Sequence, residues 1–251
     1  MIEVRNVSKT FGDNQVLSDI TADFAKGKTN LIIGASGSGK TTLTKCIVGL
    51  HEVDQGGSVL FDDRNFSDMD FTERKTIRQE IGFLFQGSAL FDSLSVEENV
   101  IFPLKMFTNK TKEEMLERVN FCLKRVNLDN VNHLFPAELS GGMKKRVGIA
   151  RAIAMNPKYL FCDEPNSGLD PQTSIVIDNL IQEITYEYNI TTIVITHDMN
   201  SVMEIGDKVY FIHKGQKWWE GTKEDILHTE NKEVVDFVYA SKFMRMFREK
   251  S

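Results

Sequence analysis

One eight-residue run constrains this chain more than any other feature, because residues 34–41 read Gly-Ala-Ser-Gly-Ser-Gly-Lys-Thr. The run matches the pattern Gly-x-x-x-x-Gly-Lys-Ser/Thr, in which glycines let the backbone curl so that several N–H groups face a phosphate. An apolar strand pattern at 30–33 precedes it, and a helical pattern at 40–50 follows, so the positive end of the helix dipole points at the same anion. The sequence therefore predicts a strand–loop–helix phosphate site.

Two side chains carry the chemistry of this loop. Lys40 is expected to reach the β- and γ-phosphates, and the hydroxyl of Thr41 is the expected oxygen ligand for Mg²⁺. The motif alone leaves the nucleotide and the work coupled to it undetermined. The residues expected to contact the nucleotide here are Gly34, Ala35, Ser36, Gly37, Ser38, Gly39, Lys40, Thr41 and Thr42.

A second apolar strand pattern, 159–162, ends in the carboxylates Asp163 and Glu164. At a strand end near the phosphate loop, Asp163 would be a ligand of the Mg²⁺, and Glu164 would act as general base toward the attacking water. Acidic pairs at strand ends are common on solvated surfaces. The interpretation therefore depends on the phosphate loop upstream and on a downstream strand, 191–195, that leads to His197.

The hydrophobic pattern predicts an α/β fold in one domain, 1–251. Apolar residues nearly alternate over 2–24 around a turn at 12–14, which predicts an N-terminal antiparallel sheet. From residue 159 onward the pattern alternates strand, helix, strand. That order predicts a parallel core sheet that binds ligands at the carboxyl ends of its strands.

The middle of the chain, from about 90 to 155, is predicted to form a helical subdomain. Ser95 with Glu98, and Thr111 with Glu114, fit capping boxes at two helix starts. An apolar stripe at helical spacing follows the second box, and core packing is its expected role. The stripe consists of Met115, Val119, Cys122, Leu123 and Val126.

A second glycine-rich helix start lies at 139–143, which reads Leu-Ser-Gly-Gly-Met. Ser140 can cap the helix, and Gly141 and Gly142 allow its N-terminus to approach an anion. A phosphate-loop protein needs only one phosphate cradle within the chain. This second start therefore suggests a site that another subunit fills.

Taken together, these motifs resemble the ATP-binding cassette (ABC) ATPase subunits over nearly the whole chain. The shared elements also include Gln86, the loop 167–170 that ends at Asp170, and His197. A small GTPase would carry an Asn-Lys-x-Asp motif, which this sequence lacks. The resemblance implies a P-loop NTPase fold, ATP and Mg²⁺ as cofactors, and a head-to-tail homodimer with two ATP molecules between the chains.

The resemblance also implies roles for single residues. Phe11 would stack on adenine, where the family more often has Tyr, and His197 would hold the γ-phosphate. Gln86 would contact Mg²⁺ or the water and report the nucleotide state to a membrane partner. The residues that would bind the γ-phosphate of the ATP held by the other chain are Ser140, Gly141 and Gly142, and Asp170 would also be a nucleotide-binding residue. Two departures from the family pattern, Met143 and Asn166, touch no reacting group in the expected arrangement.

Two segments, 86–104 and 139–154, are similar to the ATPases of the Mla/Mce phospholipid-trafficking systems. That similarity implies lipid transport between membranes, a transmembrane permease, a lipid-binding MCE-type subunit and a small cytosolic accessory subunit. The chain would then be a peripheral protein on the cytoplasmic face of the inner membrane. An importer ATPase for a small solute such as an amino acid would share every catalytic motif, so it stays open as the alternative.

Composition and spacing weigh against other classes. The formal net charge of −6 disfavours a nucleic-acid coat, so no nucleic-acid partner is expected. Soluble ABC proteins of DNA repair carry a long coiled-coil or zinc insertion, whereas 140 − 40 = 100 residues separate Lys40 from Ser140 here, without heptads. Cys46, Cys122 and Cys162 lie far apart, which argues against disulfides and structural zinc.

The end of the chain, 231–251, is predicted to form a helical tail. An apolar stripe over 232–250 would need a cover, since exposed stripes of this kind are a liability. Packing on its own cassette is the favoured interpretation, and docking on the partner chain or on an accessory subunit is the alternative. The stripe comprises Val234, Phe237, Val238, Ser241, Met244, Phe247 and Arg248.

Overall fold

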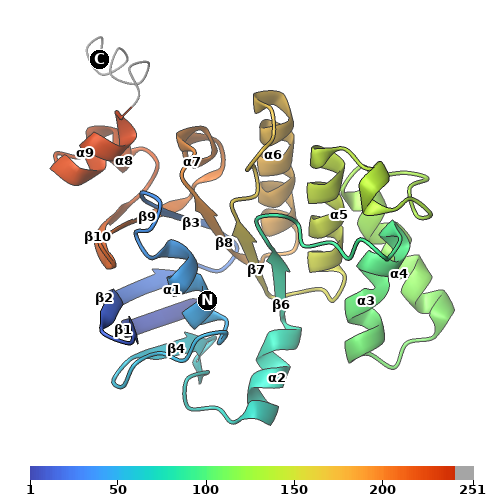
Figure 1. The fold of residues 1–251 in the computed structure, drawn as a ribbon, viewed down its shortest axis with the longest axis horizontal. Helices are drawn as coiled ribbons and strands as arrows, with labels where there is room; N and C mark the ends of the chain where they lie inside the picture. The colour runs from blue at the N-terminus through green and yellow to red at the C-terminus, as the bar shows by residue number, and fades with distance from the viewer. Residues whose placement is uncertain (241–251) are drawn as a thin grey trace. The chain divides into compact units, whose positions relative to one another are not determined.

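The computed structural model describes residues 1–240, and the chain divides into two compact units. The first unit consists of Met1–Asp68 together with Ile195–Ser251, and the second is Met69–Val194. Figure 1 colours the chain from its N-terminus to its C-terminus, so each unit can be followed by colour. Each unit is described by itself below.

The first unit opens with an antiparallel sheet in the order β2-β1-β4-β5. Phe11 pairs with Asn14 across the turn, and Gly12 supplies the positive φ of +59° that this turn requires. Ile2, Val4 and Val7 point inward and are fully buried, as the near-alternation in the sequence predicts. The strands are β1 (Ile2–Phe11), β2 (Asn14–Phe24), β4 (Ser58–Phe61) and β5 (Arg64–Asn65).

Three further strands of this unit lie in the order β10-β9-β3. β3 and β9 are parallel, and β9 and β10 form a hairpin that turns at Lys214 and Gly215. Their bounds are β3 (Thr29–Ile33), β9 (Lys208–His213) and β10 (Gln216–Gly221). The helices of the unit are α1 (Lys40–Ile47), α7 (Met199–Ile205), α8 (Asp225–His228) and α9 (Lys232–Val238).

The second unit holds strands in the order β8-β7-β6, of which β6 and β7 are parallel. They are β6 (Ile81–Leu84), β7 (Tyr159–Asp163) and β8 (Thr191–Thr196), and the unit boundary falls near the end of β8. Because β6 and β7 run the same way, the loops that follow them leave the sheet at one edge. The parallel strands, the antiparallel N-terminal sheet and the helices confirm the predicted fold class.

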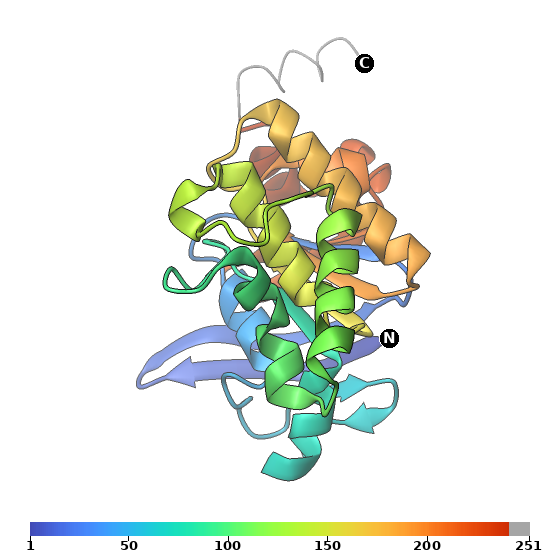
Figure 2. The same cartoon turned by 90° about the vertical axis from the view of Figure 1, so that its right-hand side faces the viewer.

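Helices make up the rest of the second unit. α3, α4 and α5 pack against one another, and α5 also packs against β6 and α6 (Figures 1 and 2). The two predicted capping boxes are present, since Ser95 and Thr111 each accept from the N–H of the glutamate three residues on. The elements are α2 (Phe71–Gln79), α3 (Val96–Phe107), α4 (Lys112–Arg125), η1 (Pro136–Glu138), α5 (Gly141–Ile153) and α6 (Pro171–Glu187).

The predicted core of the helical region is confirmed. Val119, Cys122 and Val126 are fully buried, whereas Met115 at the start of the stripe is half-buried. The three cysteines are free thiols, and burial raises the pKa of Cys46 and of Cys122 to about 11. None of the helices within residues 1–240 has the length and apolar character needed to span a bilayer.

The predicted helical tail starts in the structure as α9. α9 ends at Val238, and Val234 and Val238 are buried. The ring of Phe237 lies 5.3 Å from that of Phe211 on β9, within the same unit. Packing on its own unit, the favoured interpretation, therefore holds for this part, while the rest of the stripe, from residue 241, lies outside the described residues.

Candidate functional site

The phosphate loop joins β3 to α1 in the first unit. All five residues of β3 are buried, and the chain then turns through Gly34 at φ +146°. A Cβ on Gly34 would lie 2.2 Å from the backbone oxygen of Ile212, and one on Gly39 would lie 2.8 Å from Leu17 Cδ2. The loop therefore takes its path only because both positions lack a side chain.

The loop presents groups of the kind that bind an anion. Lys40 is 7% exposed and folds back over the loop, where its Nζ donates to the carbonyl oxygens of Gly34 (2.8 Å) and Ala35 (2.9 Å). Gly39 caps α1 without a side-chain hydrogen bond, so the N-cap residue itself offers no side-chain acceptor to the first N–H groups of the helix. The buried hydroxyl of Ser38 also lacks a hydrogen-bond partner. These residues fit a phosphate chain.

The turn between β9 and β10 supports this loop from the same unit. The N–H of Gly215 donates to the carbonyl oxygen of Ser38 at 3.0 Å, and the carbonyl of Gly215 accepts from the N–H of Ser18 at 2.8 Å. Gly215 has φ +75°, and a Cβ there would lie 2.3 Å from the backbone oxygen of Val16. The loop is thus tied to the antiparallel sheet through one glycine.

Phe11 is placed at the end of β1 as a partly exposed ring, with 43% of its surface accessible. The imidazole of His51 packs against it edge-on, with ring centroids 5.1 Å apart, and the ammonium of Lys9 lies 5.2 Å from the ring centroid. Lys9 is held in turn by the carbonyl oxygen of Glu52 at 2.7 Å. The contact between His51 and Phe11 joins segments 40 residues apart in the sequence, so no local motif points to it.

His197 lies in the first unit, directly after β8, and is exposed. The next residue, Asp198, caps α7 by accepting from the N–H of Asn200 at 2.9 Å. The first unit thus contains the phosphate loop, Phe11 and His197. The other predicted site residues belong to the second unit.

The second unit brings Gln86, Asp163 and Glu164 to one edge of its sheet. Leu84 and Cys162 are register partners on the parallel strands β6 and β7, so Gln86 and Glu164 each follow two residues beyond a paired position. Gln86 is exposed, and the two acidic residues are half-buried. Glu164 has φ +48°, the left-handed region that non-glycine residues occupy only when their surroundings hold them there.

A buried lysine of α5 reaches this edge. Lys145 is 5% exposed, and its Nζ donates to the backbone oxygen of Gln86 and to that of Glu164, the latter at 3.2 Å. Burial lowers the pKa of Lys145, an effect that the nearby charges of Cys162, Glu164 and Asp163 oppose. The sequence analysis assigns this lysine no role, and its burial is visible only in the structure.

The second glycine-rich segment forms the predicted helix start. Ser140 caps α5, and its Oγ accepts from the N–H of Met143 at 3.2 Å, so the predicted cap is confirmed. Gly141 is exposed, and a Cβ on Gly142 would lie 2.6 Å from Thr173 Cγ2.

Asp170, the last residue of the predicted 167–170 loop, caps α6. Its carboxylate accepts from the N–H of Thr173 at 3.0 Å. Hydrogen bonds from the Thr173 hydroxyl and N–H lower the pKa of Asp170. The structure thus gives this side chain a local role, and its predicted part in nucleotide binding stays a prediction.

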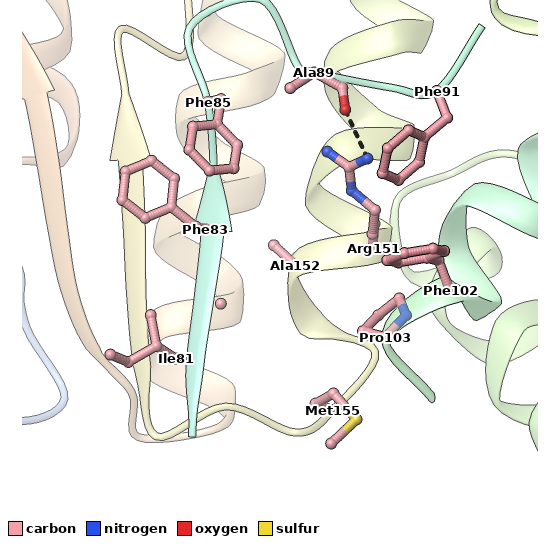
Figure 3. A pocket seen from close by; sticks show the side chains of 11 residues that line it. Ile81, Phe83, Phe85, Ala89, Phe91, Phe102, Pro103, Arg151, Ala152 and Met155 are labelled. Atoms are coloured by element: carbon pink, nitrogen blue, oxygen red, sulfur yellow. Dashed lines mark hydrogen bonds between the residues drawn. The ribbon is translucent and has the colours of Figure 1, made fainter. Parts of the chain in front are cut away.

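An apolar pocket of about 370 Å³ opens beside the loop after β6 (Figure 3). Phe85, Phe91 and Phe102 contribute rings that are 38–43% exposed. Arg151 of α5 lies at its edge and donates to the carbonyl oxygens of Ser88 (2.6 Å) and Ala89 (2.8 Å), both of which have positive φ. The pocket is therefore an aromatic-lined surface, and the loop beside it is hydrogen-bonded to α5 through Arg151.

The described residues contain no cluster of three or more His, Cys, Asp or Glu side chains that could hold a metal ion. Mg²⁺ prefers few protein oxygen ligands and completes its shell with phosphate oxygens and water. Thr41, Gln86 and Asp163 supply hydroxyl, amide and carboxylate oxygens of that type. Each is chemically suited to a metal ion that also takes oxygens from a nucleotide, and Thr41 belongs to the first unit whereas Gln86 and Asp163 belong to the second.

Comparison with known proteins agrees with this geometry. The methionine import ATP-binding protein MetN of Clostridium tetani is 42% identical over 212 residues, which are 84% of this chain and 66% of that protein. MetN of Campylobacter jejuni is 36% identical over 259 residues, covering 97% of this chain and 77% of that protein. This chain thus spans about two thirds to three quarters of the length of these relatives.

Solved structures and a family model give the same result. The dimeric ATP-binding cassette MJ0796 bound to ADP and Pi has a TM-score of 0.80 at 32% identity, covering 89% of this chain and 99% of that one. CbiO1 of Clostridium perfringens, part of the ABC transporter complex cbiONQ, has a TM-score of 0.84 at 29% identity, covering 98% of both chains. The ABC transporter family model matches residues 17–167, and the chain belongs to that family.

Proposed function

We propose that this chain hydrolyses ATP to drive an ABC importer for a small solute of the amino-acid class. The observation that carries ATP hydrolysis is the phosphate loop, with the unpartnered Ser38 hydroxyl, the inward-folded Lys40 and the open start of α1. The amino-acid class is supported by the MetN relatives, which are named as methionine import proteins.

The residues divide the reaction between them. Lys40 and the N–H groups of the loop bind the β- and γ-phosphates, and Thr41, Gln86 and Asp163 would hold Mg²⁺, which neutralises phosphate charge when bound. Glu164 accepts a proton from water while the water oxygen bonds to the γ-phosphorus. The bond from that phosphorus to the β–γ bridging oxygen breaks, and ADP and phosphate leave.

Replacing the base tests this assignment. Glu164→Gln keeps the shape of the side chain and loses the proton acceptor, so kcat should fall by roughly 10²- to 10⁴-fold. ATP affinity, measured by calorimetry, should stay unchanged because the phosphate loop is intact. Size-exclusion chromatography with ATP should then show a trapped dimer, and turnover at the unmodified rate would remove Glu164 from the role of base.

Two copies of the chain complete each site in this proposal. Ser140 and the two glycines after it lie at the start of α5 and would contact the γ-phosphate of ATP bound to the partner. The dimeric state of MJ0796 supports this arrangement. Phe11 would stack on adenine, and His197 would donate to the γ-phosphate.

We propose that a transmembrane permease binds at the aromatic pocket of the second unit. Its exposed rings would be costly to leave in water, whereas an apolar segment of a partner would cover them. Phe102→Arg should abolish co-purification with the permease and leave ATP binding intact. Phe121→Arg is the matched control, because Phe121 on α4 is also exposed, at 48%, and lies outside the pocket. If the permease fails to co-purify with either variant, the pocket is rejected as its binding site.

The two candidate functions of this chain differ in the compound that is transported. Phospholipid trafficking, with an MCE-type subunit and a small cytosolic accessory subunit, is the second candidate, and the segments 86–104 and 139–154 favour it. The MetN relatives favour the importer, and they give no support to an MCE-type subunit. Affinity capture of the tagged chain from its native host would decide. A permease with a solute-binding protein supports import, and an MCE-type subunit supports lipid traffic.

A further inference from the structure

Helix α5 approaches the sheet edge that carries Gln86 and Glu164 unusually closely. Gly148 makes this possible, because a Cβ there would lie 2.7 Å from Leu84 Cδ1 and 3.4 Å from Ser88 Cβ. One turn before this glycine, Lys145 extends into the space between the loops that follow β6 and β7. A single ammonium therefore connects three elements of the second unit.

The role of the Lys145 ammonium depends on which atoms accept its hydrogen bonds. Buried cations are usually paired with a carboxylate, since an unpaired buried charge is costly. Here the hydrogen bonds of Lys145 Nζ go to two main-chain oxygens, those of Gln86 and Glu164. The lysine therefore holds the backbone at these two positions, and both carboxylate oxygens of Glu164 stay out of its hydrogen bonds.

The backbone that it holds is strained. Glu164 lies at φ +48°, a conformation that costs an L-residue about 1–2 kcal/mol and persists only where neighbours enforce it. A hydrogen bond to the carbonyl of that same residue favours the observed peptide orientation. Without it, the peptide can relax toward negative φ, which swings the side chain away from its present direction.

We propose that Lys145 is a positioning residue for hydrolysis: from α5 it fixes the Glu164 and Gln86 backbones and so aims the base at the water. The inference rests on the proposed role of Glu164 as base. It extends that role to a residue whose hydrogen bonds go to the main chain of the site.

Lys145→Met tests the inference, because methionine is unbranched and fills much of the space but has no N–H donors. Misplacement of a catalytic group by about 1 Å costs on the order of 10²-fold, so kcat should fall about 10- to 100-fold. The KM for ATP should change less than about 3-fold, because Lys40 is intact. Lys145→Arg, which keeps the charge and the donors, should restore most of the rate.

A double mutant separates positioning from general loss of structure. If Lys145 acts through Glu164, Lys145→Met should lower single-turnover hydrolysis of radiolabelled ATP less than about 3-fold when added to Glu164→Gln. Lys124→Met, the same change on the exposed side of α4, is the control and should leave kcat unaltered. Should Lys145→Met fail to fold, Lys145→Gln replaces it, since the shorter amide cannot span both carbonyls.

Each outcome decides the question. The inference is supported if Lys145→Met lowers kcat when Glu164 is present but has little effect when added to Glu164→Gln, and if Lys145→Arg restores most of the rate. Unchanged kcat in Lys145→Met, an equal loss in both backgrounds, or a raised KM with normal kcat overturns it. Normal turnover of Glu164→Gln alone would instead reject the proposed base, which is a separate result.

Discussion

At the scale of single residues, the positions of most residues in the site are set by backbone conformation and not by side-chain identity. Gly34 and Gly39 let the phosphate loop curl, and Gly215 lets the β9–β10 turn touch Ser38. Glu164 takes a positive φ without being glycine, at a position where chemistry is proposed. Strain that is held in place by neighbours is typical of functional positions.

Because Gly215 lies close to the sheet, we expect its substitution to destabilise the protein, and Gly12 offers a matched control. Gly215→Ala must accept φ +75° and a Cβ 2.3 Å from Val16 O, whereas Gly12→Ala, at φ +59°, meets no atom within 4 Å. Gly12→Ala should cost about 1 kcal/mol of unfolding free energy. Gly215→Ala should cost clearly more and also weaken ATP binding, because the hydrogen bond to Ser38 shifts. Denaturant titration and calorimetry measure both, and equal effects would contradict the proposed support of the loop.

At the scale of elements, local signals found most of the fold. The antiparallel strands around the turn at 12–14 and the capping boxes of α3 and α4 are read directly from residue types. α2 was missed, although Asp70 and Glu73 form a capping box that marked its start. α9 ends at Val238 within the predicted tail, and a periodic apolar pattern does not by itself show where a helix ends.

The packing of α9 on its own unit can be tested by one buried methyl pair. Val234 is fully buried, and its neighbour Asp236 on the same helix is exposed. Val234→Ala removes the equivalent of two methylene groups from the core, which should lower the free energy of unfolding by about 1.5 kcal/mol. Asp236→Ala should change it by less than about 0.5 kcal/mol. If Val234→Ala is as stable as the parent yet impairs dimer formation, α9 serves an interface instead.

The candidate site was predictable wherever its motifs are local in sequence, and not where it depends on tertiary approach. The phosphate loop, the acidic pair and the Ser140 cap were each identified from a few consecutive residues. The burial of Lys145 was not, since it follows from the approach that Gly148 permits. Likewise, nothing near His51 in the sequence points to the ring of Phe11, with which it packs.

At the scale of the whole molecule, the proposed sites are shared between two chains, and two variants can show it. Lys40→Ala removes a cation that faces the phosphates within one chain. A lost charged hydrogen bond of about 1.5–3 kcal/mol would weaken ATP binding roughly 10- to 100-fold. Ser140→Arg should leave ATP affinity of the isolated chain unchanged and abolish turnover, because its clash arises only in the dimer. Calorimetry and a steady-state ATPase assay separate the two, and equal loss of binding would contradict a segment that acts on the partner's ATP.

The choice of acceptors by Lys145 also bears on how this site can drift in evolution. Both of its hydrogen bonds end on main-chain oxygens, which every amino acid possesses. Exchanging the side chains at 86 and 164 therefore leaves the attachment available, whereas exchanging position 145 removes it. A related chain could therefore lose the carboxylate at position 164, and with it ATP hydrolysis, and still keep the hydrogen bonds from position 145 to the main chain. In such an inactive chain we expect the lysine to be retained after the glutamate has been replaced.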